Sequence, residues 1–451
     1  MFQRLAAKAT SLTQQYLPAP YLFSLLLTFL AATLAIFVTR TALADVVSYW
    51  YGGLWEILTF TTQMVLVLMC GHALVDAPAV RRVLDWFSSL PQTERQAGVL
   101  VFLVSWAAAL FNWGFCLVVA GVLVREIPKR LPTVSKGYLA AAGYTGFGVW
   151  ASGLSSSIAL VSATPGSPMN IIEQFAHRTV PLHETLLASY NIVPVLGMGV
   201  LMPLLFWRIH PSPGPSSAPS SAPSPSASVP SAEAEARETT PPAARTFAER
   251  IEQSRWITVL LVLMSLGYLF HRIRQGAFSL DLNLMIFLLL VIGWILHGTP
   301  IRYMQAFHGG ARAAGPLLLA YPMYGGILGL IRDTGLADWF AQLFVSFSTA
   351  QTLPFWSYIS SNVITLFVPS GGGHWAVQGP VMVKAAIALD ASLAKTAMAV
   401  AFGEQTGNLV QPFWALAIVS IAGLSIREMM GYCLLALGIA FPLFGLSLLV
   451  F

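Results

Sequence analysis

The sequence predicts an all-α polytopic membrane protein. Of its 451 residues, 56% are hydrophobic and only 10% are charged, whereas a soluble domain carries about 25% charged residues. Apolar runs long enough to cross a bilayer recur along the chain, without the polar–apolar alternation of barrel strands. The clearest runs are 21–39, 57–75, 186–207, 256–270, 282–296 and 429–451.

The first half, 1–207, is predicted to form one membrane repeat. Its apolar run at 21–39 is too long for a signal-peptide core, so we expect it to be retained as a helix. The predicted order is two spans (21–39 and 54–75), an amphipathic stretch with Arg81, Arg82, Asp85 and Arg95, a broken apolar segment (98–124), an interrupted helix (137–160) and a final span (186–207).

A polar segment, 208–255, separates this repeat from the rest of the chain. Pro211 to Pro242 consists almost entirely of Pro, Ser and Ala, and a short charged stretch follows it. Such a composition buries no apolar face, so the whole segment is predicted to be a disordered linker. Residues 256–281 are expected to form a connecting helix and loop.

The remainder, 282–451, repeats the order of the first half. The predicted elements are spans at 282–297 and 313–331, an amphipathic stretch (336–349), a glycine-broken segment (354–390), an interrupted helix (393–422) and a final span (429–451). The additional helix at 256–271 starts the second half on the opposite side of the membrane. The repeats are therefore predicted to be inverted, as in many secondary transporters.

Charge placement gives a topology. We place the N-terminus inside and treat 98–124 and 354–390 as re-entrant hairpins. Most of the 24 Lys and Arg residues then lie in cytoplasmic segments, as the positive-inside rule requires. The N-terminus and linker are predicted to be cytoplasmic and the C-terminus periplasmic. Loop charge accounts for the net charge of +5, so no nucleic-acid partner is expected.

The most informative segment runs from Val368 to Pro380 and contains three consecutive glycines between prolines. This composition opposes a helix, and freed backbone groups cannot face lipid. We therefore expect Pro369 to Pro380 to form the tip of a hairpin and to contribute to a solute site.

Four polar interruptions fall in corresponding places of the two halves. Half-helix N-termini suit a carboxylate, whereas half-helix C-termini and Ser, Thr or Asn oxygens suit Na⁺ or a protonated group. Two roles fit each Asn or Gln side chain about equally well: holding its hairpin together, or contacting the solute. The candidate substrate-binding residues are Asn112, Trp113, Gly114, Ser152, Gly153, Ser155, Ser156, Asn362, Ser370, Gly371, Gly372, Gly373, His374, Gln378, Thr406, Gly407 and Asn408.

Two ionisable residues are candidates for ion coupling. His374 titrates near neutrality when unperturbed, and it is either a proton carrier or a packed neutral side chain that caps a broken helix. Glu404 lies within an apolar segment, where function is the default interpretation; the alternative is a structural acceptor of backbone amides.

Aromatic residues at the interruptions are candidates for an apolar wall around a short alkyl chain. Trp113, Trp150 and Trp375 fit this role, while anchoring at the bilayer interface is the preferred interpretation for Trp414. No arginine lies in any interruption, which favours a small monoanion over a dicarboxylate.

Other functional classes lack support. The chain has no HExxH, no GxSxG and no nucleotide-binding loop, so neither an enzyme, a cofactor nor direct ATP coupling is expected. Cys70, Cys116 and Cys433 form no metal pattern, although Na⁺ binding stays open. A passive channel is the third alternative, but inverted repeats favour alternating access.

The run PSGGGHWAVQGP, with FNWG, YTGFGVWASGLSSS and GEQTGNLVQPFW, resembles the bacterial short-chain fatty acid transporter family. The resemblance covers both membrane halves but not the linker. It implies an inner-membrane carrier of monocarboxylates such as acetoacetate or butyrate, coupled to H⁺ or Na⁺. The wider group of ion-coupled carboxylate transporters further implies an elevator-type movement and a homodimer, with a dicarboxylate carrier as the alternative.

Overall fold

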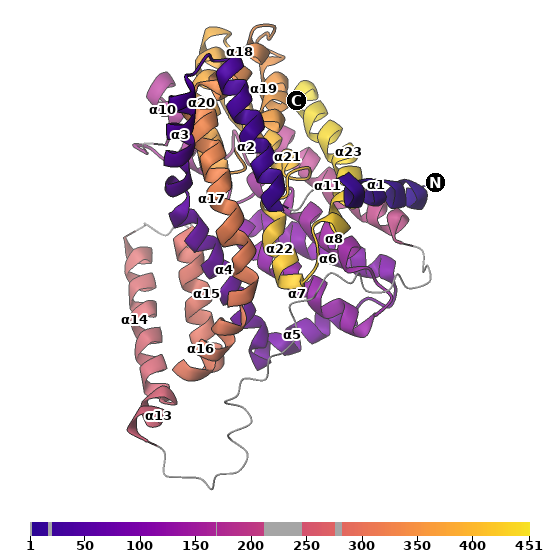
Figure 1. Ribbon diagram of the computed structural model, residues 1–451, viewed down its shortest axis with the longest axis vertical. Coiled ribbons are helices and arrows are strands. Elements are labelled where there is room, and N and C mark those ends of the chain that lie inside the picture. The colour runs from indigo at the N-terminus through magenta and orange to yellow at the C-terminus, as the bar shows by residue number, and fades with distance from the viewer. Residues whose placement is uncertain (1, 17–19, 168, 212–245, 276–281) are drawn as a thin grey trace.

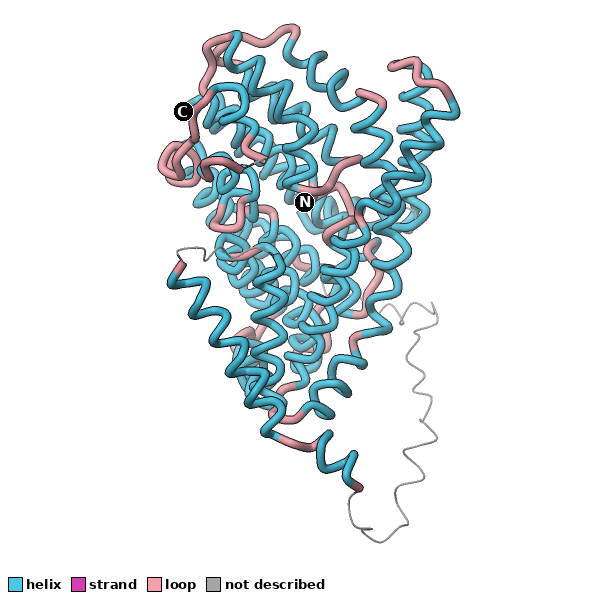
Figure 2. The backbone as a smooth tube through the Cα atoms, turned by 90° about the vertical axis from the view of Figure 1, so that its left-hand side faces the viewer, coloured by secondary structure: helices cyan, strands magenta, loops and turns pink. Residues whose placement is uncertain are grey.

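The computed structural model describes residues 2–16, 20–167, 169–211, 246–275 and 282–451. Within these ranges the chain forms helices and connecting loops and no strand (Figure 2). Seven helical segments are long and apolar enough to cross a membrane by length and composition. They are 43–74, 94–111, 136–163, 189–209, 255–274, 314–333 and 427–450. The prediction of an all-helical, multi-pass chain is confirmed.

The first half contains most of the predicted elements. In chain order its helices are α1 (Phe2–Tyr16), α2 (Pro20–Phe37), α3 (Leu43–Glu56), α4 (Leu58–Asp76), α5 (Pro78–Ser89), α6 (Glu94–Phe111), α7 (Trp113–Arg130), α8 (Lys136–Phe147), the 3₁₀ turn η1 (Trp150–Ser152), α9 (Ser157–Ala163), α10 (Ile171–Ala176) and α11 (Ser189–Ile209). Helices α1, α3 and α10 were not predicted. α1 lies crosswise against the first turns of α23 (Figure 1).

The second half follows a short helix where disorder was predicted. Its elements are α13 (Phe247–Glu252), α14 (Arg255–Arg274), α15 (Leu282–His297), α16 (Pro300–Gly309), α17 (Ala311–Asp333), α18 (Leu336–Val345), α19 (Leu353–Thr365), α20 (Gly371–Ala388), α21 (Leu393–Gly407), α22 (Ala415–Ala422) and α23 (Arg427–Val450). The prediction of a disordered linker over 208–255 is therefore wrong at 247–252. These residues form α13, which contains the hydrophobic side chains of Phe247 and Ile251. Its residues 212–245 lie outside the described ranges.

Both predicted hairpins reverse the chain direction. In the first, α6 and α7 are joined at Asn112, and the Cys116 thiol donates to the Ser105 carbonyl at 3.2 Å. In the second, α19 and α20 run side by side, and the Ser357 hydroxyl lies 3.0 Å from the sulfur of Met382. The order of hairpin, broken helix and final helix therefore occurs twice. Re-entry from opposite membrane faces stays a prediction.

The glycine segment differs from the expectation. The break covers 366–370 only, and Gly371 to Gly373 form the first turn of α20, which continues through Pro380. The predicted tip, Pro369 to Pro380, is therefore wrong over most of its length. The backbone amides of a first helical turn have no intrahelical acceptor in any helix. In α20, packing outweighs the low helix propensity of glycine.

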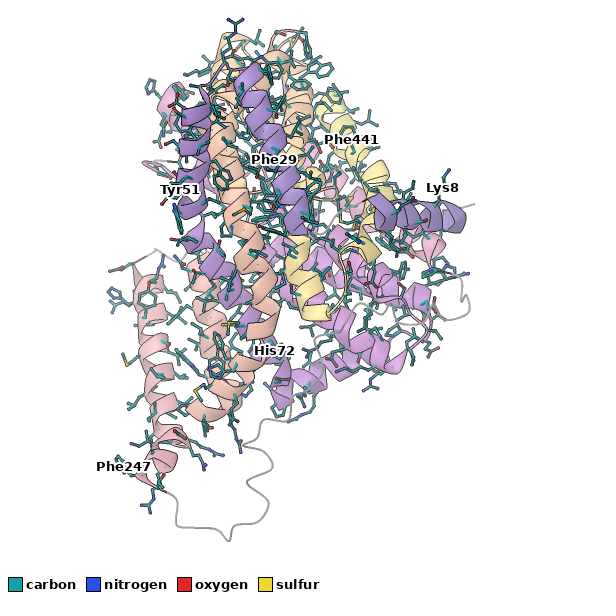
Figure 3. All side chains as sticks on the ribbon, viewed as in Figure 1. Lys8, Phe29, Tyr51, His72, Phe247 and Phe441 are labelled. Atoms are coloured by element: carbon teal, nitrogen blue, oxygen red, sulfur yellow. The ribbon has the colours of Figure 1, made fainter. Side chains whose placement is uncertain are left out.

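A close helix crossing joins the two halves away from the hairpins. Helices α3 and α17 meet where a Cβ atom on Gly53 would lie 2.3 Å from the Gly325 carbonyl oxygen. Small residues let membrane helices approach in this way. At the end of the same pair, Arg332 makes two hydrogen bonds to Glu56, at 2.7 and 2.9 Å. Phe29 on α2 and Tyr51 on α3 are exposed on the outside of this region (Figure 3).

Candidate functional site

The tip of the first hairpin is tied to the broken helix of its own repeat. The Leu154 amide donates to the Leu110 carbonyl at 2.7 Å, and the Trp113 amide donates to the Ser155 hydroxyl at 3.0 Å. The ring of Trp113 then reaches the other repeat, because its centroid lies 4.9 Å from that of Trp414. The loop between α21 and α22 thus contacts the first tip.

The tip of the second hairpin packs against the broken helix of the first repeat. A Cβ atom on Gly371 would lie 2.7 Å from the Trp150 ring and 3.0 Å from the Ser157 hydroxyl oxygen. Only glycine permits this approach without displacement. Each hairpin tip therefore contacts the interruption of the other repeat.

The two interrupted helices are also bonded to each other. The Tyr144 hydroxyl lies 2.8 Å from the carbonyl oxygen of Asn408 and 3.1 Å from that of Gln411. The Ser152 hydroxyl pairs with the Gln405 amide group, whose nitrogen is 3.0 Å away. The two Tyr144 contacts hold the turn that follows α21, and the Ser152 contact fixes the Gln405 side chain within α21. The four interruptions therefore meet in one place.

His374 binds within its own hairpin. Its Nε2 atom lies 2.6 Å from Gln378 Oε1 and 3.1 Å from the Ser361 hydroxyl, and its Nδ1 atom lies 3.3 Å from the Thr365 hydroxyl. The Gln378 nitrogen donates in turn to the Ser360 hydroxyl at 2.7 Å. These contacts join α19 to α20 across the full width of the hairpin.

This network is satisfied by a neutral imidazole. Gln378 Oε1 is an acceptor, so Nε2 carries the hydrogen, and Nδ1 accepts from Thr365. The Ser361 hydroxyl donates to the Val400 carbonyl at 2.7 Å, which extends the network to α21. Both ring nitrogens therefore have partners inside the hairpin, and the choice between a proton carrier and a packed neutral side chain stays a prediction.

Several other candidates hold the local structure. Asn112 and Ser156 accept backbone amides at the N-termini of α7 and α9. Asn362 bonds the Tyr358 carbonyl and the Thr406 hydroxyl, which fixes α19 against α21. Gly114, Gly153 and Gly407 lie where an added Cβ would meet Met285, Leu110 and Thr365, respectively. These residues shape the site, and their contact with a solute stays a prediction.

A second group of buried polar atoms has no partner. Both carboxylate oxygens of Glu404, both side-chain amide atoms of Asn408 and the Gln411 nitrogen lack a hydrogen bond within the described structure. Glu404 and Asn408 are fully buried and lie four residues apart, on one face of α21 and its end. An unpaired buried carboxylate is expensive, so Glu404 requires a proton, a cation or another donor.

The N-terminus of α20 is partly accessible. Ser370 precedes it without a side-chain capping bond, and Ser370, Gly372 and Gly373 are partly exposed. Nothing lies within 4 Å of a Cβ atom built on Gly372. Backbone amides and the positive end of an 18-residue helix therefore face accessible space.

Aromatic rings form one wall beside these groups. The Trp414 centroid lies 5.9 Å from that of Phe147 and 6.5 Å from that of Trp150. Trp414 is only 4% exposed, so its predicted anchoring at the bilayer interface is wrong. It lies instead between the two repeats. Trp375 is also buried, on α20.

Sequence reasoning missed Tyr144, Thr145, Phe147 and Gln411 as members of the site. Thr145 and Gln411 carry buried unpartnered atoms, and Tyr144 connects the repeats. All four lie in motifs that stand out by composition, but an aromatic or threonine in an apolar helix gives no signal of a partner far away in the sequence.

Broken helices that meet around buried polar groups, inside a bundle of apolar spans, define a multi-pass membrane transport protein. The model of the family described as "Short chain fatty acid transporter" matches residues 1–451. The chain belongs to this family of transporters, which are not enzymes.

Individual relatives agree with the family assignment. A protein of Escherichia coli (strain K12), whose name gives short-chain fatty acid transport as a provisional function, is 34% identical over 453 residues, which cover 100% of both chains. A relative of the same name in Haemophilus influenzae is 34% identical over 451 residues, with 99% of both chains covered.

Two solved transporter structures are more distant. The YdaH transporter of Alcanivorax borkumensis is 16% identical with a TM-score of 0.42, covering 95% of this chain and 98% of its own. MtrF of Neisseria gonorrhoeae is 17% identical with a TM-score of 0.36, covering 96% and 95%.

Proposed function

We propose that the chain is an ion-coupled secondary carrier of short-chain monocarboxylates, such as butyrate or acetoacetate, in the bacterial inner membrane. The observation that carries the proposal is the meeting of four helix interruptions around an accessible helix N-terminus and an unpartnered carboxylate. Full-length membership of a short-chain fatty acid transporter family supports the same substrate class.

The substrate carboxylate is assigned to the N-terminus of α20. Gly371 to Gly373 present amides there, and Gly372 leaves room for close approach. The alkyl chain would lie toward Trp113, Trp150 and Trp414. The interruptions contain no Lys or Arg, so helix dipoles and amides must supply the positive potential, which suits one negative charge better than two.

Coupling is assigned to Glu404 rather than to His374. Glu404 is buried without a hydrogen-bond partner in the described structure, so binding of H⁺ or Na⁺ would remove an uncompensated charge before the site moves. His374 is assigned a positioning role, because its ring nitrogens already bond Gln378 and Thr365.

The proposed transport cycle uses two inverted repeats and an elevator-type movement, in a homodimer. The repeated order of hairpin and broken helix supports the repeats. The paired hairpins, with the site between their tips, support movement of the site as a unit. Cysteine labelling from either side of the membrane would test the inversion directly.

Uptake by the purified protein in liposomes tests the function. Labelled butyrate should accumulate under an inward H⁺ or Na⁺ gradient and should be displaced by acids of one to six carbons, but poorly by dicarboxylates. Absence of uptake under every imposed gradient would overturn the proposal.

Two variants separate the assigned roles. Glu404→Gln should abolish gradient-driven accumulation while leaving counterflow exchange of substrate. Gly372→Val should weaken uptake, because the added side chain fills the space at the start of α20. The control is Gly438→Val on α23, where the added side chain also enters open space, and it should leave uptake unchanged. Equal effects of the two valines would remove α20 from the substrate site.

A further inference from the structure

A cavity lies behind the tip of the first hairpin, outside the proposed substrate site. It has a volume of about 820 Å³ and is lined by α4, α5, α6, α7 and α15. Its lining is apolar apart from Asn112, and the Asn112 side chain is already used to cap α7. The cavity therefore offers no group that would recognise a carboxylate.

The size of the cavity also excludes the transported acid as its occupant. Cavities of about 300–1,000 Å³ hold drug-sized ligands, so an acid of a few carbons would leave most of this one empty. A void this large would be costly if dry and unfavourable if filled by water against an apolar wall. A long apolar chain matches both its volume and its lining.

The cavity opens to the outside of the bundle through large apolar side chains. Val83, Phe111, Phe115 and Ile292 all line it and are 54%, 57%, 42% and 44% exposed. Exposed apolar surface of this kind indicates contact with a membrane or a partner. Candidate spans α4 and α6 supply two of the cavity walls, so we expect this opening to face the acyl region of a bilayer.

Helix α5 closes one end of the cavity and provides the charge for a headgroup. Val80, Val83 and Phe87 lie on one face of α5 and line the cavity, while Arg81, Arg82 and Trp86 are exposed. This is the pattern of an interfacial helix. Arg81 pairs with Asp76 at 3.0 Å, and Arg82 beside it is exposed.

We propose that this cavity is a binding site for a bilayer phospholipid, with an acyl chain between the first hairpin and α15 and an anionic phosphate near Arg82. The site would place a lipid beside the contact between Gly114 and Met285, where the hairpin tip meets α15. The proposal does not depend on the transported substrate.

Photolabelling tests this site. The full-length protein is reconstituted in liposomes of phosphatidylethanolamine and phosphatidylglycerol, with a phosphatidylglycerol that carries a diazirine on its acyl chain. After dilution with unlabelled lipid and illumination, the attached lipid is mapped by mass spectrometry. We expect persistent labels on cavity residues of α6 and α7, while labels on the exposed surface of α14 are lost on dilution.

Matched variants make the result decisive. Ala107 lines the cavity and is exposed to it, so Ala107→Trp should fill the space and reduce the persistent label several-fold. Leu263→Trp, on the exposed surface of α14, should leave it unchanged. Arg82→Ala should reduce the label from phosphatidylglycerol more than that from a phosphatidylethanolamine probe. Cavity labels that dilute as fast as those on α14, or that survive Ala107→Trp, would overturn the proposal.

Discussion

Replacing His374 tests whether this residue holds the second hairpin together or carries a proton. His374→Ala removes the contacts at 2.6 Å to Gln378 and 3.3 Å to Thr365. Leaving the buried Gln378 oxygen unsatisfied costs about 1–3 kcal/mol, and the space left by the ring adds about 2 kcal/mol. The total is about 3–5 kcal/mol, which for a chain of 451 residues corresponds to a fall in Tm of about 3–5 °C.

The matched variant is His374→Gln, whose amide can donate to Gln378 and accept from Thr365. Thermal unfolding of the purified protein in detergent should show most of the lost stability restored, and liposome uptake should keep its dependence on pH and Na⁺. The reasoning is refuted if His374→Gln is stable yet loses gradient-driven uptake, because that outcome would assign proton transfer to the imidazole. It is equally refuted if His374→Ala unfolds at the wild-type temperature.

Three further predictions follow from buried contacts. Glu404→Gln replaces an unpartnered carboxylate with an amide of equal size. Tm in the same unfolding assay should therefore stay equal or rise, while ion-dependent uptake is lost. A large fall in Tm would show that the carboxylate is structural. Gly403→Ala would place a Cβ atom 2.3 Å from that of Ser361, an overpacking that costs about 1–3 kcal/mol. Its control, Gly438→Ala, meets nothing within 4 Å and should be neutral or stabilising in the same assay. Trp150→Ala should shift the competition profile in liposome uptake toward longer acids, and an unchanged profile would remove this ring from the alkyl wall.

The positions of the helix breaks could be predicted because they follow from local chemistry. Asn112, the serines at 155–157 and the end of α21 at Gly407 all interrupt apolar runs with residues that favour caps and turns. The same logic failed for Gly371 to Gly373, where glycine begins a helix rather than breaking it. Composition locates a helix break to within a few residues, but tertiary packing determines the residue at which the helix begins again.

The partners across the break could not be predicted. Tyr144 donates to a carbonyl 264 residues away, and a backbone oxygen carries no sequence signature. Trp414 gave a misleading signal for the same reason, since a tryptophan near the end of an apolar run has the same local appearance at the lipid interface and in a packed centre. The neutral, fully bonded state of His374 likewise depends on residues of α19 that its own motif does not contain.

The crosswise contacts between the repeats impose an order on biosynthesis. Ser152 bonds Gln405, which is translated 253 residues later. At about 5–20 residues per second, this interval lasts about 13–50 s. During that time the Ser152 hydroxyl has no native partner, although Leu154 and Ser155 can already bond the first hairpin. Until α21 emerges, only water, another protein or a nearby backbone carbonyl can satisfy this hydroxyl.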